Sequence, residues 1–176
     1  MDINTEFIAW AVEGRSTGRG VTIGVEPFKS RLGAHEPKAK DRLRHVDGAV
    51  RAVWSEVCKL NELWDGIEFR TRTIKVRIEE PVIGAGARSS MLVGLFNGAV
   101  YGCLMAFTTN VDLMHPSTWK AEMRSQLGIE SAISSKEHVR RAIDLVMPEV
   151  TERIKQYPKG QQQDLYDAVG IATGGS

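Results

Sequence analysis

The sequence has few of the residues that would indicate a disulfide-linked, zinc-binding or membrane-spanning protein. It has only two cysteines and four histidines in 176 residues, without the CxxC or HExxH spacing of zinc sites. No apolar run approaches the roughly 20 residues that cross a bilayer, and the N-terminus lacks the basic and apolar regions of a signal peptide. We therefore expect one cytoplasmic domain, 1–176, without a membrane span, in which Cys58 and Cys103 are reduced core thiols.

A large excess of charge of one sign is also absent. The formal net charge is +1, which neither requires nor excludes a polyanionic partner. The charge is uneven locally, because the segment 29–44 holds six basic and two acidic residues. A solvated face and a phosphate-facing patch both fit this segment, which includes Lys38, Lys40, Arg42 and Arg44.

Hydrophobic periodicity predicts alternating strands and helices. Runs rich in β-branched and aromatic residues predict strands at 7–12, 21–25, 74–79 and 108–113. Apolar residues at intervals of three and four predict helices at 37–60 and 85–106. This order is typical of an α/β fold with a mixed central sheet flanked by helices.

Polar residues at the expected helix starts predict three further helices. Ser117 is expected to cap one, with Lys120 in its first turn, where a cation is unfavourable unless it faces an anion. Ser134 or Ser135 is expected to cap the next, and Asp164 the last.

The helix at 85–106 carries Gly94, Gly98 and Gly102 at four-residue spacing. Each glycine costs about 1 kcal/mol relative to alanine in a helix. Close approach of another helix or the sheet, inside the chain or across a dimer, would compensate for this cost.

Two carboxylates near the end of the chain allow two interpretations. Asp164 and Asp167 follow a Gly- and Gln-rich segment, 160–163, and would be an N-cap and an N3 acid. They would also share one helix face, as metal ligands do if other elements contribute further acids. Asp2 precedes the first strand and Glu79 ends another, although an exposed acid at a strand end explains Glu79 equally well.

Taken in order, these features resemble the RuvC family of Holliday junction resolvases, within the ribonuclease H-like nucleases. The resemblance covers nearly the whole chain and rests on Asp2 with Asn4, 76–79, Gly94 with Gly98, 116–120, Lys136 with Val139, and 164–168. It implies a ribonuclease H-like fold and a metal-dependent, structure-selective endonuclease. Such an enzyme acts as a homodimer on four-way DNA junctions.

The resemblance also implies roles for individual residues. By position, Asp2, Glu79, Asp164 and Asp167 are expected to bind two Mg²⁺ ions per active site, for which Mn²⁺ can substitute. Lys120 and Lys136 match basic positions close to the DNA and the active site, and Lys120 counts among the catalytic residues. Surface lysines at helix starts are the alternative. Lys38, Lys40, Arg42 and Arg44 are the remaining candidates for DNA binding.

The sequence departs from the family pattern in two places. Only Met1 precedes Asp2, where the family has a full strand, so either upstream residues are missing or the first strand is rebuilt. A terminal amine beside the metals would also add positive charge. Val82 stands where bacterial members often have a stacking aromatic residue. We therefore expect the relaxed selectivity of bacteriophage-type relatives, which also cut forks and flaps.

Two other functions use the same residues. A ribonuclease H-like nuclease acting on RNA precursors or RNA–DNA hybrids would need the same acids. A non-catalytic junction-binding domain would keep the fold with an incomplete site.

Overall fold

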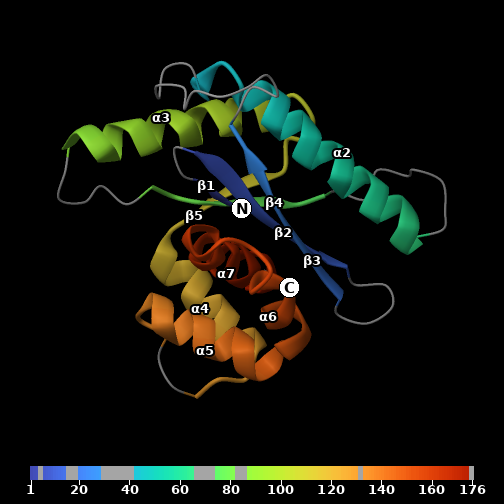
Figure 1. The fold of residues 1–176 in the computed structure, drawn as a ribbon, viewed down its shortest axis with the longest axis vertical. Helices are drawn as coiled ribbons and strands as arrows, with labels where there is room; N and C mark the ends of the chain where they lie inside the picture. The colour runs from blue at the N-terminus through green and yellow to red at the C-terminus, as the bar shows by residue number, and fades with distance from the viewer. Residues whose placement is uncertain are drawn as a thin grey trace.

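A computed structural model of the chain describes residues 1–3, 6–14, 20–28, 42–65, 74–81, 87–130 and 133–174. The strands are β1 (Asp2–Ile3), β2 (Phe7–Gly14), β3 (Gly20–Pro27), β4 (Val76–Glu79) and β5 (Val111–Met114). The helices are α2 (Val46–Asp65), α3 (Ala87–Leu104), α4 (Pro116–Gln126), α5 (Lys136–Val146), α6 (Pro148–Ile154) and α7 (Lys159–Thr173). α2 and α3 lie on one side of the strands, and α4 to α7 lie on the other, with α7 next to the strands (Figure 1).

The strands form two hydrogen-bonded groups that Met1 connects. β1, β2 and β3 pair antiparallel in this order, and β4 pairs parallel with β5. The N-terminal amine of Met1 donates to the Arg77 carbonyl at 2.7 Å, and the Glu79 N–H donates to the Met1 carbonyl at 3.2 Å. Met1 thus bonds to Arg77 and to Glu79, two positions apart on one strand, which is the pattern of parallel strand pairing. β1 therefore lies between β2 and β4, and the predicted mixed sheet is confirmed.

Alternating side chains of the strands supply two cores. Phe7 and Ala9 of β2 pack with the helices α4 to α7, whereas Ile8 and Trp10 pack with α2 and α3. Successive residues of a strand point to opposite faces, so burial on both faces requires a nearly continuous apolar run. The run at 7–12 predicted from the sequence supplies it, and the observed strand extends to Gly14.

Two predicted helices differ from the observed ones in their bounds. α2 continues beyond residue 60 to Asp65, and the predicted start at 37 lies outside the described residues. α3 ends at Leu104 rather than at the predicted 106, and its predicted start at 85 lies outside the described residues. A Cβ added to Gly94, Gly98 or Gly102 would meet no atom of the described residues within 4 Å. Phe96, Val100 and Leu104 face the core instead, so the described residues do not supply the predicted close packing inside the chain.

The caps of α4 and α5 test the predicted helix starts. The N-cap of α4 is His115 rather than Ser117, because the His115 ring accepts from the Ser117 N–H and Pro116 fits the first helical position. Lys120 consequently lies two residues further into α4 than predicted. Ser135 caps α5 as expected, accepting from the His138 N–H at 3.2 Å.

The remaining structural expectations concern the thiols and the membrane. Cys58 and Cys103 are not in a disulfide, as predicted, but they are half-buried rather than core residues. Among the described residues, no helix has the length and apolar character needed to span a membrane.

Candidate active site

Asp2 and Glu79 lie on the same face of the sheet. Asp2 is opposite Ala9 in the β1–β2 ladder, and Ala9 packs against the α4 to α7 side. In β4, Val76 and Ile78 are buried in the other core, so Arg77 and Glu79 point toward α4 and α7. Arg77 confirms this direction by forming an ion pair with Glu122 of α4 at 2.9 Å. The Met1 backbone then holds the Asp2 strand next to Glu79.

α7 carries Asp164 and Asp167 in its middle, not at its start. The helix begins at Lys159 after the N-cap Pro158, so the residues expected to form a loop, 160–163, belong to its first turns. A glycine near a helix end costs at most about 1 kcal/mol, and the packing of α7 outweighs it. Asp164 is therefore not an N-cap, and that prediction is wrong. Asp164 is half-buried, and Asp167 is only 4% exposed.

Electrostatics show that the four acids act on one another. Burial raises the pKa of Asp2 well above its usual value, and Asp164, Glu79 and Asp167 raise it further, in this order. Burial and then Asp167 raise the pKa of Glu79. Burial also raises the pKa of Asp167, to which Asp164 adds. Acids from β1, β4 and α7, far apart in the sequence, thus form one negatively charged cluster, which we call the acidic site.

Lys136 and Lys120 are the cations of the acidic site. The Lys136 Nζ lies 3.6 Å from Oδ2 of Asp167. Burial opposes the charge on Lys136, but Asp167, Asp2 and Asp164 outweigh it and raise its pKa. Both lysines lower the pKa of Glu79 and of Asp167, although burial and the neighbouring acids outweigh them. The structure thus brings both predicted lysines to the acids.

The N-terminal amine also lies at the acidic site. Burial lowers the pKa of the Met1 amine to about 5, against the opposing effect of Asp2 and Glu79, and Arg77 lowers it further. An amine with this pKa is mostly neutral near pH 7. The amine therefore adds little positive charge to the metal-free acidic site.

Two neutral side chains hold the carboxylates in ways that the sequence did not indicate. The indole Nε1 of Trp119 donates to Oε2 of Glu79 at 2.9 Å. The Gln163 amide donates to Oδ1 of Asp167 at 3.1 Å, one helical turn away. The spacing of Gln163 and Asp167 could have signalled the second bond, whereas Trp119 and Glu79 are 40 residues apart.

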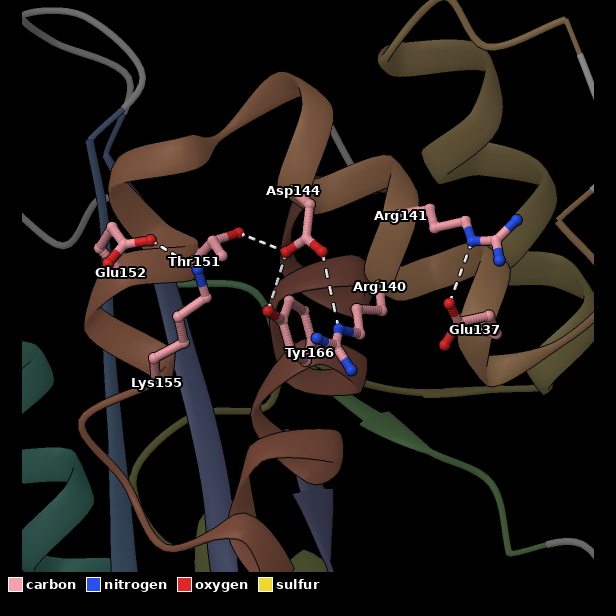
Figure 2. Close-up of polar contacts among 8 residues, drawn as sticks. All are labelled: Glu137, Arg140, Arg141, Asp144, Thr151, Glu152, Lys155 and Tyr166. Carbon is pink, nitrogen blue, oxygen red and sulfur yellow. Dashed lines mark hydrogen bonds and ion pairs between the residues drawn. The ribbon is translucent and has the colours of Figure 1, made fainter.

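A polar cluster holds α7 against α5 and α6 (Figure 2). Oδ1 of Asp144 accepts from the Tyr166 hydroxyl at 2.9 Å and from the Thr151 hydroxyl at 2.8 Å. Arg140 lies 3.6 Å from Oδ2 of Asp144, and its guanidinium is 6.0 Å from the Tyr166 ring centroid. Because Tyr166 lies between the two acids of α7 in the sequence, this cluster limits rotation of the helix that carries them.

The basic segment 29–44 is only partly described. Lys38 and Lys40 lie outside the described residues. Arg42 forms an ion pair with Glu6 at 3.4 Å, and Arg44 is exposed before the start of α2. DNA binding by these four residues stays a prediction.

The chemistry of the acidic site fits an open site for a hard divalent cation. Carboxylate oxygens suit Mg²⁺, and a cation would relieve the crowded negative charge. Among the residues that the structure describes, no three Asp, Glu, His or Cys side chains converge as ligands of one ion. Mg²⁺ does not require such a cage, because it keeps several waters and binds one or two carboxylates together with substrate phosphates.

Comparisons with known proteins bear on the fold. No protein-family model matches the sequence, and no curated protein matches it. The structure of T. thermophilus RuvC in complex with a Holliday junction substrate is similar over 98% of this chain and 88% of that chain, with a TM-score of 0.61 and 18% identity. The chain has a RuvC-like fold. A second Thermus thermophilus RuvC structure is similar over 96% of this chain and 92% of that chain, with a TM-score of 0.49 and 19% identity. The first of these similarities, at a TM-score of 0.61, confirms the predicted ribonuclease H-like α/β fold.

Proposed function

We propose that the chain is a divalent-metal-dependent endonuclease that cuts four-way DNA junctions. The observation that carries this proposal is the acidic site, in which carboxylates of β1, β4 and α7 share one charged cluster beside two lysines. A cluster of buried acids with raised pKa values, drawn from separate elements, is typical of a functional site. The RuvC-like fold supports the choice of substrate, because the similar T. thermophilus protein was seen with a Holliday junction.

Each residue of the acidic site has a role in this proposal. Asp2, Glu79, Asp164 and Asp167 would hold two Mg²⁺ ions, or Mn²⁺ in their place. The bound metal would supply an activated water and positive charge for the scissile phosphate and the leaving oxygen. Lys136 holds Asp167 in place by its ion pair.

Lys120 is the second cation assigned to the substrate. Its Nζ lies 5.3 Å from the Trp119 ring centroid, and its charge acts on Glu79 and Asp167. An ammonium placed beside the carboxylates would attract the DNA backbone to them.

A synthetic four-way junction tests the proposed function. Purified protein should cut it with Mg²⁺ or Mn²⁺ but not in EDTA, and Asp167→Asn should abolish cutting while retaining binding. Asp47→Asn is a matched control, because Asp47 is an exposed α2 acid that pairs with Arg51 at 2.8 Å on the other side of the sheet. Cutting in EDTA, or by Asp167→Asn, would contradict the proposed chemistry.

The same assay separates the two alternatives. Linear duplex or an RNA–DNA hybrid that outcompetes the junction would indicate a ribonuclease H-like activity instead. Tight junction binding without turnover in any metal would indicate a non-catalytic domain.

Paired cutting of a junction requires two active sites, and we propose that α3 forms the dimer interface. Its outward side has Gly98 and Gly102 exposed, together with Met91 at 59% and Leu95 at 48% exposure. An apolar surface without bulky side chains suits close helix packing. Gly98→Leu should abolish a dimer seen by sedimentation velocity without destabilising the monomer, since no atom of the described residues lies within 4 Å of its Cβ position. A wild-type monomer at micromolar concentration would contradict this interface.

A further inference from the structure

We propose that Trp119 is a positioning residue that fixes the Glu79 carboxylate relative to the acids of α7. The inference rests on the proposed function, because it concerns the carboxylates of the same site. Trp119 is fully buried, and its indole N–H donates to Oε2 of Glu79 at 2.9 Å. An indole N–H can only donate, and a buried one usually has a partner. The bond therefore favours one orientation of the Glu79 carboxylate.

The Trp119 ring is itself held by α7. A Cβ added to Gly170 would lie 2.6 Å from Cζ3 of Trp119, and one added to Gly174 would lie 2.9 Å from the Trp119 carbonyl oxygen. Real Cβ atoms do not approach this closely, so both positions must be glycine for α4 to reach its observed distance from α7. Gly170 is one turn after the acids of α7. Trp119 thus packs on the helix that carries Asp167 and hydrogen-bonds to the strand that carries Glu79.

Two further contacts keep α4 in place on β4. Arg77 forms an ion pair with Glu122 at 2.9 Å. Arg77 is two residues before Glu79 in β4, and Glu122 is three residues after Trp119 in α4. Met123 is fully buried beside Gly170, where a Cβ would lie 3.0 Å from its Sδ. Because α4 is fixed to β4 and α7 together, the position of the indole N–H is determined by the fold rather than by rotation of an exposed side chain.

Removing the N–H should weaken metal binding without changing the fold. Oε2 of Glu79 would lose the donor that fixes it, and the carboxylate could then turn among its rotamers. Partners that orient a metal ligand typically contribute about 10–100-fold to metal affinity or activity. We expect an effect of about 10-fold, at the low end of that range, because Glu79 is one of four acids.

The decisive variant replaces Trp119 with 3-benzothienylalanine, introduced by codon suppression. This analogue has sulfur in place of the N–H and keeps the shape of the ring, so the packing against Gly170 is retained. Trp119→Phe is a second variant that can be made by ordinary mutagenesis. The same two changes at Trp54 are the matched control, because Trp54 stacks on Phe107 at 5.5 Å between ring centroids in the other core.

Three measurements are made on the full-length protein. Calorimetric titration with Mg²⁺ alone should give a dissociation constant about 10-fold weaker for the Trp119 variants, and the half-saturating Mg²⁺ for junction cutting should rise by the same factor. Junction affinity in EDTA should be unchanged. Excess Mg²⁺ should restore cutting, and the Trp54 variants should match wild type.

Each other outcome overturns the positioning role. A benzothienyl variant with wild-type Mg²⁺ affinity and cutting would show that the N–H is not needed. A loss of folded protein with an unchanged half-saturating Mg²⁺ would show that Trp119 is only structural. If wild-type protein binds no Mg²⁺ and cuts no junction, the proposed function is itself wrong and the positioning role falls with it. The wild-type measurement thus separates the two failures.

Discussion

The close contact between α4 and α7 can be tested by Gly170→Ala. The new Cβ would lie 2.6 Å from Cζ3 of Trp119 and 3.0 Å from Sδ of Met123. Both neighbours are fully buried, so neither can give way without displacing other core residues. Gly48→Ala is the matched control, because a Cβ on this exposed α2 glycine would meet no described atom within 4 Å.

The two substitutions should differ in their effect on the free energy of unfolding. Alanine is favoured over glycine inside a helix by about 1 kcal/mol, and Gly48→Ala should gain up to that amount. Overpacking a core costs about 1–3 kcal/mol, which cancels or exceeds the same gain at Gly170. We therefore expect Gly170→Ala to be less stable than Gly48→Ala by about 1–3 kcal/mol. For a chain of this size, each kcal/mol shifts the thermal midpoint by about 2–4 °C.

Urea unfolding followed by far-UV circular dichroism measures this difference. The midpoint for Gly170→Ala should lie below that for Gly48→Ala with the same m-value, since only the native packing changes. The tryptophan fluorescence of the protein should also change in Gly170→Ala, because the ring of Trp119 must move. Equal stabilisation by both alanines would refute the close approach of α4 to α7, and with it the argument that Gly170 holds Trp119.

Two further predictions concern the polar groups of α7. In metal-free protein, burial raises the pKa of Asp167 in the folded state above its usual value, which the unfolded chain keeps. Protonated Asp167 therefore stabilises the fold fully at pH values below the usual carboxyl pKa. This stability is lost as the pH rises through the raised pKa of the folded state. Asp167→Asn should therefore gain stability over wild type as the pH rises, by at most about 1.4 kcal/mol per unit in urea titrations with EDTA, and a constant difference would contradict the raised pKa. The lowered pKa of the Met1 amine acts in the opposite direction but is common to both proteins. Tyr166→Phe removes the donor to Asp144 at 2.9 Å and should cost about 1–2 kcal/mol in the same assay, whereas an unchanged midpoint would show that this bond does not hold α7.

The sheet and its strands could be predicted because their pattern is local. Hydrophobic patterns within each strand predict which residues face the core. These patterns are the apolar runs at 7–12 and 21–25 and the alternation that ends at Glu79. The predicted bounds fell short of the observed ones, since β2 extends to Gly14 and α2 extends to Asp65. Pairing of the Met1 backbone with β4 joins residues far apart in the sequence, and no local pattern indicates it.

The roles of Trp119 and Tyr166 could not be predicted for a related reason. Each is an apolar residue at helical spacing, for which a place in the core is the ordinary interpretation, and both are indeed buried. Their polar atoms meet partners 40 and 22 residues away, and only the packing of α4, α5 and α7 brings these groups together. The close contacts of Gly170 and Gly174 with α4 were likewise not predicted, because the sequence does not name the partner of a glycine.

The position of Asp164 and Asp167 in the middle of α7 strengthens the case for a functional site. At a helix start, the two acids would stabilise the helix as a cap and a dipole partner, and no further role would be needed. In the observed helix neither position can cap, since the helix begins at Lys159. Asp167 is instead nearly buried among other acids, and its raised pKa means that its ionised form costs folding free energy near pH 7. Lys136 only partly offsets this cost, because burial outweighs its effect on that pKa. A charge that destabilises the metal-free fold is explained if a bound cation neutralises it during catalysis.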